Sequence, residues 1–243
     1  MAGCAESHCL KLLAFDTSTE LLSVAALRGE PGGELPLEYT SAGGAQASTA
    51  LIPAIQQLLA QAGLRLGELD AIAFGRGPGS FTGLRTACSV AQGLAFGAGI
   101  PVLAVDTLLA VAEDARHRCG LEQVVAVLDA RMAEVYSAAY AWHGAGWRQQ
   151  GGISLGHPEA VAVAPGWSLA GNAVAAYADR LPAAAARVEA MPTASALLRL
   201  APALMAAGLA GPAARATPLY IRDKVAQTTE ERASSRAAQA AKP

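Results

Sequence analysis

Charged residues are scarce in this chain of 243 residues, and their signs nearly cancel. Asp, Glu, Lys and Arg make up 16% of the sequence, with 18 basic side chains against 20 acidic ones, and 53% of the residues are hydrophobic. This composition excludes an intrinsically disordered chain, and it excludes a strongly basic protein that binds nucleic acid by itself. The length allows one large domain or two small ones with a substantial core.

Cysteines and long apolar runs are also few. The four cysteines do not form a disulfide framework, so free thiols and a cytoplasmic location are expected. The mean hydropathy is +0.31, yet Gly, Pro, Arg or Asp interrupts every apolar run before the roughly 18–20 residues that a membrane-spanning helix needs. The first eleven residues lack the basic start and apolar stretch of a signal peptide. We therefore expect no membrane partner.

The sequence shows no metal-binding motif and no complete catalytic set. The patterns HxxxH and HExxH are absent, so a zinc hydrolase is not indicated, and no Ser/His/Asp or Cys/His set is identifiable. Cys4, His8 and Cys9 lack a fourth ligand, and we predict no metal site there. No catalytic residue is predicted from spacing alone.

The order of apolar and turn-forming segments predicts an α/β fold. Residues 10–15 and 21–27 are apolar runs on either side of the polar turn DTST, which is typical of an antiparallel hairpin. Leucine and isoleucine recur at helical spacing over residues 48–62. Further elements are expected in the order strand, helix, strand and helix at residues 70–74, 81–97, 101–105 and 107–118. Such alternation predicts a mixed sheet with helices on its faces.

A second hairpin pattern begins at residue 124. An apolar run at residues 124–128 leads into a turn at Asp129, and a strand-like segment follows at residues 134–141. Asp129 and Asp16 stand at the same place in the two hairpins, which indicates an internal duplication. We therefore predict two domains between a flexible leader and a flexible tail, at residues 1–9, 10–118, 119–225 and 226–243 in that order.

The glycine-rich segment GRGPGSFTG at residues 75–83 is the strongest local motif. Its glycines permit positive φ angles and the close approach of another group, and the start of the helix behind it carries free N–H groups. Ser80 and Thr82 add hydroxyls and Arg76 and Arg85 add positive charge, so the loop is a candidate anion site; a tight turn with Ser80 as the helix N-cap is the alternative. The Lys-Ser/Thr pair of a Walker A loop is absent. The candidate residues are Gly75, Arg76, Gly77, Pro78, Gly79, Ser80, Thr82, Gly83 and Arg85.

The two hairpin turns are further candidates. An Asp beside hydroxyls and free N–H groups can hold the phosphate of a metal–nucleotide complex, and an Asx turn that closes the hairpin is the alternative. In the second hairpin Arg131 could clamp an anion, or pair with Asp129 at the surface. The candidates are Asp16, Thr17, Ser18 and Thr19 in the first turn, and Asp129, Arg131 and Glu134 in the second.

Small residues recur every three or four positions along residues 81–97. Because a glycine inside a helix costs about 1 kcal/mol relative to alanine, close packing against the chain's own sheet or a partner helix is expected. The residues are Gly83, Ala87, Ala91, Gly93 and Gly97.

Five segments occur in an order that resembles the TsaB (YeaZ) family of bacterial tRNA threonylcarbamoyladenosine biosynthesis proteins. They are LLAFDTST, LIPAIQQLL, AFGRGPGSFTGLRTACSVAQGLA, VLDARMAEVY and TPLYIR, and the resemblance spans residues 10–222. It implies the fold shared by actin, sugar kinases and chaperone ATPases (ASKHA), with two domains of similar topology.

The resemblance also implies a function. Members of the family act as a non-catalytic partner of the paralogous transferase TsaD, together with the ATPase TsaE and with TsaC, which makes threonylcarbamoyl-adenylate. The complex modifies the adenosine 3′ of the anticodon in tRNAs that read codons beginning with A. The implied partners are TsaD in a heterodimer, TsaE, a second copy when the chain is alone, and tRNA through the complex. No cofactor is implied beyond weak nucleotide binding at residues 16–19.

The resemblance places the pairing surface on the helices at residues 51–62 and 84–97. The predicted contact residues are Leu51, Ile55, Leu58, Ala87, Ala91 and Leu94. Ala47 stands where the family often has a histidine, so a role of that histidine does not transfer. Two alternatives remain open: an ATP-dependent phosphotransferase that uses Asp16, and a peptidase.

Overall fold

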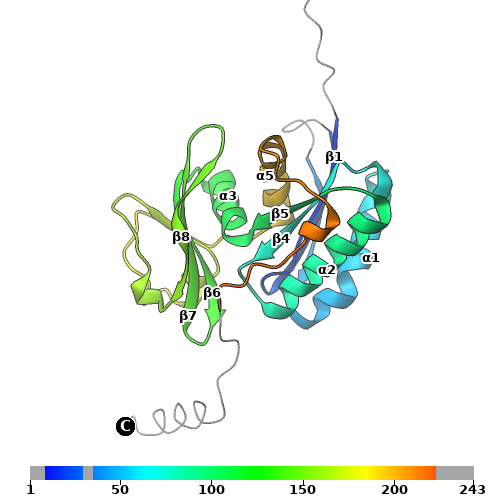
Figure 1. The fold of residues 1–243 in the computed structure, drawn as a ribbon. Helices are drawn as coiled ribbons and strands as arrows, with labels where there is room; N and C mark the ends of the chain where they lie inside the picture. Colours follow the sequence, from blue (N-terminus) through cyan, green and yellow to red (C-terminus); the bar gives the residue numbers. More distant parts are fainter. Residues whose placement is uncertain (1–8, 30–34, 223–243) are drawn as a thin grey trace, which may run out of the picture.

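Two five-stranded mixed sheets form the centre of the molecule (Figure 1). The computed structural model describes residues 9–29 and 35–222, so the predicted tail and residues 1–8 of the predicted leader lie outside the described residues. The first sheet has the order β3 (Leu37–Ala42), β2 (Leu21–Gly29), β1 (Leu10–Asp16), β4 (Ala71–Gly77) and β5 (Val102–Asp106). The second has the order β8 (Trp147–Gly156), β7 (Glu134–Trp142), β6 (Gln123–Arg131), β9 (Ser168–Ala170) and β10 (Arg187–Val188).

The second sheet repeats the strand order and the strand directions of the first. In each sheet the opening three strands are antiparallel, and the last two run parallel to the opening strand. The two hairpins expected from the sequence are therefore the first two strands of equivalent sheets. The predicted α/β fold with mixed sheets is confirmed.

Helices cover both faces of the first sheet. On one face lie α1 (Ala47–Gln61) and α2 (Phe81–Ala98), and on the other lies α5 (Ala194–Ala206). The helix α3 (Thr107–Cys119) lies between the two sheets and packs against β6 (Figure 1). The short helices are η1 (Gly44–Gln46), η2 (Leu66–Glu68), η3 (Pro158–Ala160), α4 (Ala173–Ala176) and η4 (Ala213–Arg215).

The strand β1 shows why these layers form. Its side chains alternate: Leu13 and Phe15 join the core under α1 and α2, whereas Leu12 and Ala14 join the core under α5. A strand with both faces covered reads as an unbroken apolar run, as LLAF does. The helix α5 follows the second sheet in the chain yet packs against the first one. The division into domains at residue 118 stays a prediction. After residue 193 the chain returns from the second sheet to the first, so neighbours in sequence are not neighbours in space there.

A buried carboxylate links the two halves of the molecule. Glu113 of α3 is 1% exposed and accepts hydrogen bonds from Arg116 Nε and Nη2, both at 3.0 Å. It also accepts from Trp147 Nε1 at 2.9 Å and from Arg199 Nε at 3.1 Å. Burial alone would raise the pKa of Glu113, but the hydrogen bonds from Arg116 and Trp147 and the two guanidinium charges outweigh it and lower the pKa. The group therefore joins α3, α5 and the β7–β8 hairpin as an ion cluster.

No helix among the described residues is both long and apolar enough to cross a membrane.

Candidate functional site

The turn of the first hairpin is organised by Asp16, at the end of β1. Its Oδ1 accepts hydrogen bonds from Ser18 N at 2.8 Å and Ser18 Oγ at 2.6 Å, which is the Asx turn anticipated as an alternative. Its Oδ2 has no hydrogen-bond partner among the described residues, and the side chain is 1% exposed. Burial raises the pKa of Asp16 to about 6, although the hydrogen bonds from Ser18 act in the opposite direction.

The glycine-rich loop packs directly on this turn. Ser80 N donates to Ser18 O at 2.7 Å, and Thr17 Oγ1 donates to Gly83 O at 2.7 Å. A Cβ at Gly83 would overlap Thr17 O, and a Cβ at Gly79 would lie 2.5 Å from Ser18 O. The group that approaches these glycines is the chain's own turn, so their spacing does not require an external anion.

The remaining loop residues fit the same account. A Cβ at Gly75 would overlap Asp16 Oδ2. Gly77 has a φ of +117°, and its N donates to Thr107 Oγ1 at 3.1 Å. Ser80 occupies the N-cap position of α2, but its side chain makes no capping hydrogen bond.

Both arginines predicted to add charge to an anion site are engaged elsewhere. Arg76 Nε lies 2.5 Å from Asp106 Oδ1. The guanidinium of Arg85 lies 3.7 Å from the centre of the Phe81 ring, and its Nε donates to Tyr220 Oη at 3.0 Å. Neither arginine lines the cavity described below, and their role in an anion site stays a prediction.

The turn of the second hairpin is built in a related way. Asp129 Oδ1 accepts from Arg131 N and from Tyr177 Oη, both at 2.8 Å, and Arg131 Nη1 lies 3.0 Å from Asp129 Oδ2. The pairing of Arg131 with Asp129, anticipated as an alternative, is therefore observed. Arg131, Met132 and Ala133 have φ angles of 63°, 56° and 58°, a left-handed run that is uncommon without glycine.

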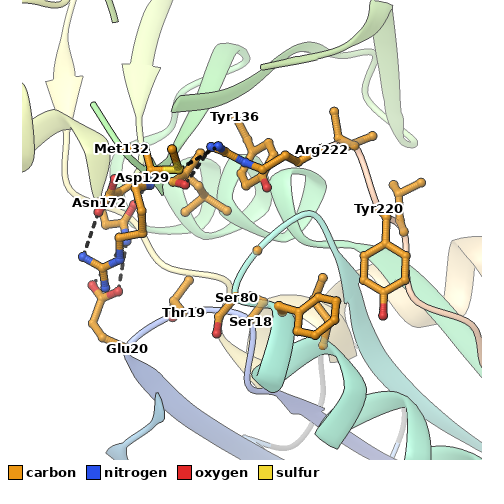
Figure 2. Close-up of a pocket in the computed structure, with 18 of the residues that line it drawn as sticks. Ser18, Thr19, Glu20, Ser80, Asp129, Met132, Tyr136, Asn172, Tyr220 and Arg222 are labelled. Atoms are coloured by element: carbon orange, nitrogen blue, oxygen red, sulfur yellow. Dashed lines mark hydrogen bonds and ion pairs between the residues drawn. The ribbon is translucent and has the colours of Figure 1, made fainter. Parts of the chain in front are cut away.

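One side chain joins the two turns. Asn172 Oδ1 accepts from Asp129 N at 2.9 Å, and Asn172 Nδ2 donates to Glu20 Oε2 at 3.1 Å (Figure 2). Glu20 directly follows the first turn, so the amide of Asn172 connects the first hairpin with the second. The sequence gives no signal for this residue, because an asparagine after a short strand carries no distinctive pattern.

A cavity of about 350 Å³ lies between the two turns. Figure 2 shows Ser18 and Ser80 beside the start of α2, with Tyr136 and Arg222 across from them. Asp16 and Thr17 do not line it, whereas Ser18, Thr19 and Ser80 do. The lining residues are Ser18, Thr19, Glu20, Gly44, Gly79, Ser80, Phe81, Leu84, Leu128, Asp129, Ala130, Arg131, Met132, Tyr136, Asn172, Leu219, Tyr220, Ile221 and Arg222.

Several polar groups at the cavity are engaged within the chain. The amide of Ser18 donates to Asp16, and the acidic residues Glu20 and Asp129 both belong to the lining. Arg131 and Arg222 also line the cavity, but each is already paired with a carboxylate. The proposed phosphate remnant at residues 16–19 is thus folded into an internal turn.

Five of the six residues predicted to contact a partner are buried in this chain's own core. They are Leu51, Ile55, Leu58, Ala87 and Ala91. Leu94 is partly buried against the same core. These apolar residues at helical spacing mark the helix face that packs on the sheet, and their role as partner contacts stays a prediction. The small residues of α2 divide in the same way: Gly83, Ala87 and Ala91 face inward, while Gly93 and Gly97 are exposed.

Comparison with known proteins identifies the family. A family model described as TsaD, tRNA N6-adenosine threonylcarbamoyltransferase, matches residues 41–230. The tRNA threonylcarbamoyladenosine biosynthesis protein TsaB of Buchnera aphidicola subsp. Baizongia pistaciae is 30% identical over 168 residues, which cover 66% of this chain and 74% of that protein. The chain belongs to the TsaB (YeaZ) family. The match to a TsaD model agrees with the paralogy of the two families that the resemblance implied.

Two further TsaB-family relatives bear on how far the likeness extends. The TsaB protein of Haemophilus influenzae is 49% identical over 128 residues, which are 52% of this chain and 52% of that protein, so the chain spans about half the length of this curated relative. The structure of YeaZ from Pseudomonas aeruginosa superposes with a TM-score of 0.80 at 40% identity. That superposition covers 87% of this chain and all of the other chain.

The buried Asp16 of this TsaB-family chain predicts a pH-dependent stability. In the unfolded chain the carboxyl loses its proton near its usual pKa of 3.8, and in the folded chain near 6. Since the folded state binds more protons between these values, stability falls as pH rises from about 4 to about 6, by up to about 3 kcal/mol. Asp16→Asn removes this titration. Urea unfolding from pH 4 to pH 7.5 should show the variant gaining stability relative to the parent chain as pH rises.

The exposed substitution Asp179→Asn is the matched control for Asp16→Asn. If the free-energy difference between Asp16→Asn and the parent chain is the same at every pH, the burial account of Asp16 is wrong.

Substitution of glycine by alanine should change stability in opposite directions at two positions of α2. Gly83→Ala would drive a methyl group into Thr17 O, and we expect it to destabilise the chain by about 1–3 kcal/mol or more. Gly93→Ala on the same helix meets no atom within 4 Å and should stabilise it by up to about 1 kcal/mol. Thermal unfolding measures both changes. Equal effects at the two positions would contradict the packing of the loop on the turn.

Proposed function

We propose that this chain is a non-catalytic subunit in the biosynthesis of threonylcarbamoyladenosine in tRNA. The observation that carries the proposal is membership of the TsaB family, together with a superposition on the whole of the P. aeruginosa YeaZ chain. The two sheets of equal strand order support the finer assignment to two ASKHA domains. In this proposal the chain acts with TsaD, TsaE and TsaC on tRNAs that read codons beginning with A.

The geometry of the hairpin turns supports a role without catalysis. A phosphotransferase of this fold would use turn N–H groups and an acidic side chain at the phosphates. Here Ser18 N donates to Asp16, and the free oxygen of Asp16 lies against Gly75 rather than in the cavity wall. These contacts favour a scaffold over an ATP-dependent phosphotransferase, with nucleotide binding weak at most. No observation on the described residues favours a peptidase.

The exposed faces of α1 and α2 are the pairing surface we propose for TsaD and for a second copy of the chain. Ile52 on α1 is 44% exposed and Phe96 on α2 is 83% exposed. Gly93 and Gly97 flank Phe96, and no atom lies within 4 Å of a Cβ built on either glycine. An exposed aromatic ring between bare stretches of backbone allows a partner helix to approach closely and to bury the ring.

The near-zero net charge agrees with indirect contact to tRNA. Affinity for nucleic acid depends largely on phosphate contacts from Lys and Arg. With 18 basic against 20 acidic residues, this chain relies on a partner for those contacts in our proposal.

An omission experiment tests the function. Unmodified tRNA is incubated with threonine, bicarbonate, ATP, TsaC, TsaD and TsaE, with and without this chain, and its nucleosides are quantified by mass spectrometry. We expect threonylcarbamoyladenosine only when the chain is present. Full modification in its absence would reject the proposed role and leave a likeness of fold alone.

The pairing surface predicts a second result. Phe96→Ser should weaken association with TsaD about tenfold, because exposed aromatic residues dominate such interfaces. The matched control is Leu209→Ser, since Leu209 is 54% exposed in the turn after α5, the helix that packs on the opposite face of the sheet. Light scattering and calorimetric titration with TsaD measure both variants. An equal loss in both, or no loss in Phe96→Ser, would reject this surface.

A further inference from the structure

The last described segment, residues 217–222, crosses from the first sheet to the second; we name it the C-terminal strap. In Figure 1 it is the orange chain that leaves η4 near α2 and ends beside β6. Before it, Gly211 pairs with Val102 of β5, and η4 packs against α2. The strap is therefore tied to the first sheet before it reaches the second hairpin.

The first anchor of the strap is the glycine-rich loop. Leu219 N donates to Arg76 O at 2.7 Å, which extends the hydrogen bonding at the end of β4. A Cβ at Gly77 would lie 2.7 Å from Leu219 O, so the missing side chain makes room for the strap. The ring of Tyr220 lies 5.7 Å from that of Phe81, and its hydroxyl accepts from Arg85.

The second anchor is the turn of the second hairpin. Arg222 Nη2 lies 2.7 Å from Glu134 Oε2 and donates to Ala130 O at 3.0 Å. Its Nη1 lies 3.2 Å from Met132 Sδ. The Arg222 side chain is only 15% exposed, so this is a partly desolvated ion pair with a further hydrogen bond to backbone.

Between the anchors the strap forms one wall of the cavity. Its residues Leu219, Tyr220, Ile221 and Arg222 all belong to the lining. Within this wall Tyr220 contacts the first half of the molecule, and Arg222 contacts the second. Movement of the glycine-rich loop away from the second hairpin would therefore break one anchor or the other.

We propose that the C-terminal strap is an internal latch that clamps the glycine-rich loop to the second hairpin and closes the cavity on that side. The two anchors then act as one unit, because a strap released at either end no longer bridges the loop and the hairpin. Opening of the cavity requires release of Tyr220 or Arg222. Anything that enters from this side and binds the open state weakens the latch, and by linkage a weakened latch favours entry.

Each anchor can be weakened without touching the other, and this separates a latch from two local contacts. Arg222→Ala removes the ion pair with Glu134, and Tyr220→Ala removes the contacts with Phe81 and Arg85. Hydrogen–deuterium exchange of the full chain, followed by mass spectrometry, reports on both sites. The informative segments are residues 76–84 beside the first anchor and residues 130–135 beside the second.

For a latch, each variant accelerates exchange at the remote anchor as well as the near one. We expect about tenfold faster exchange at residues 76–84 in Arg222→Ala and at residues 130–135 in Tyr220→Ala. Exchange in the double variant should be only slightly faster than in either single variant, since release of one anchor already opens the bridge. Arg148→Ala, on the exposed edge strand β8, is the matched control and should change neither segment.

Acceleration confined to the near anchor, or none at all, overturns the latch. If an alanine variant unfolds the chain, exchange also becomes faster in β1 and β4. The variant Tyr220→Phe is then used in place of Tyr220→Ala. That variant keeps the ring and removes only the hydroxyl that accepts from Arg85. A smaller acceleration at residues 130–135 in Tyr220→Phe supports the latch, and its absence overturns it. The outcome does not depend on tRNA modification, so it is separate from the test of the proposed function.

Discussion

The contact between the Asp16 turn and three glycines is the constraint on which the rest of the structure depends. Because β1 and β4 are parallel neighbours, the turn after one strand and the loop after the other meet at the same edge of the sheet. They can meet at this distance only without side chains at residues 75, 79 and 83. The loop leads directly into α2, so this contact also sets where the helix begins and which of its faces packs on the sheet.

The second sheet solves the same geometric problem with different residues. A Cβ at Gly171, after β9, would overlap Val127 O of β6, as the glycines after β4 approach the turn after β1. Asn172 then supplies the hydrogen bond to Asp129 that orders the second turn. The cavity is the space left between two copies of one arrangement, closed at one end by Asn172 and Glu20 and at another by the strap.

The sequence predicted what short-range periodicity can encode. The hairpins, α1, α2 and the equivalence of Asp16 and Asp129 follow from alternation, helical spacing and turn residues. Long-range packing could not be predicted from the sequence. Nothing in residues 194–206 indicates that α5 returns to the first sheet, and nothing near Arg222 indicates that it reaches Glu134. Leu51 and Ala87 were predicted as partner contacts, but they lie in the chain's own core, because an apolar stripe identifies the buried face of a helix. The motif TPLYIR stands out in the sequence, but only the structure places it over the cavity.

The internal use of the glycine-rich loop bears on the kind of protein this is. A loop that holds a ligand must keep its amides free, and its geometry then depends on whether the ligand is bound. Here Ser80 N donates to Ser18 O, and the first turn occupies the space beside the glycines, so the start of α2 is fixed by the chain itself. The exposed side of that helix, with Phe96 between Gly93 and Gly97, is therefore presented in one orientation without a nucleotide. In the proposed function, a subunit that offers a constant surface to a partner needs this independence from a nucleotide.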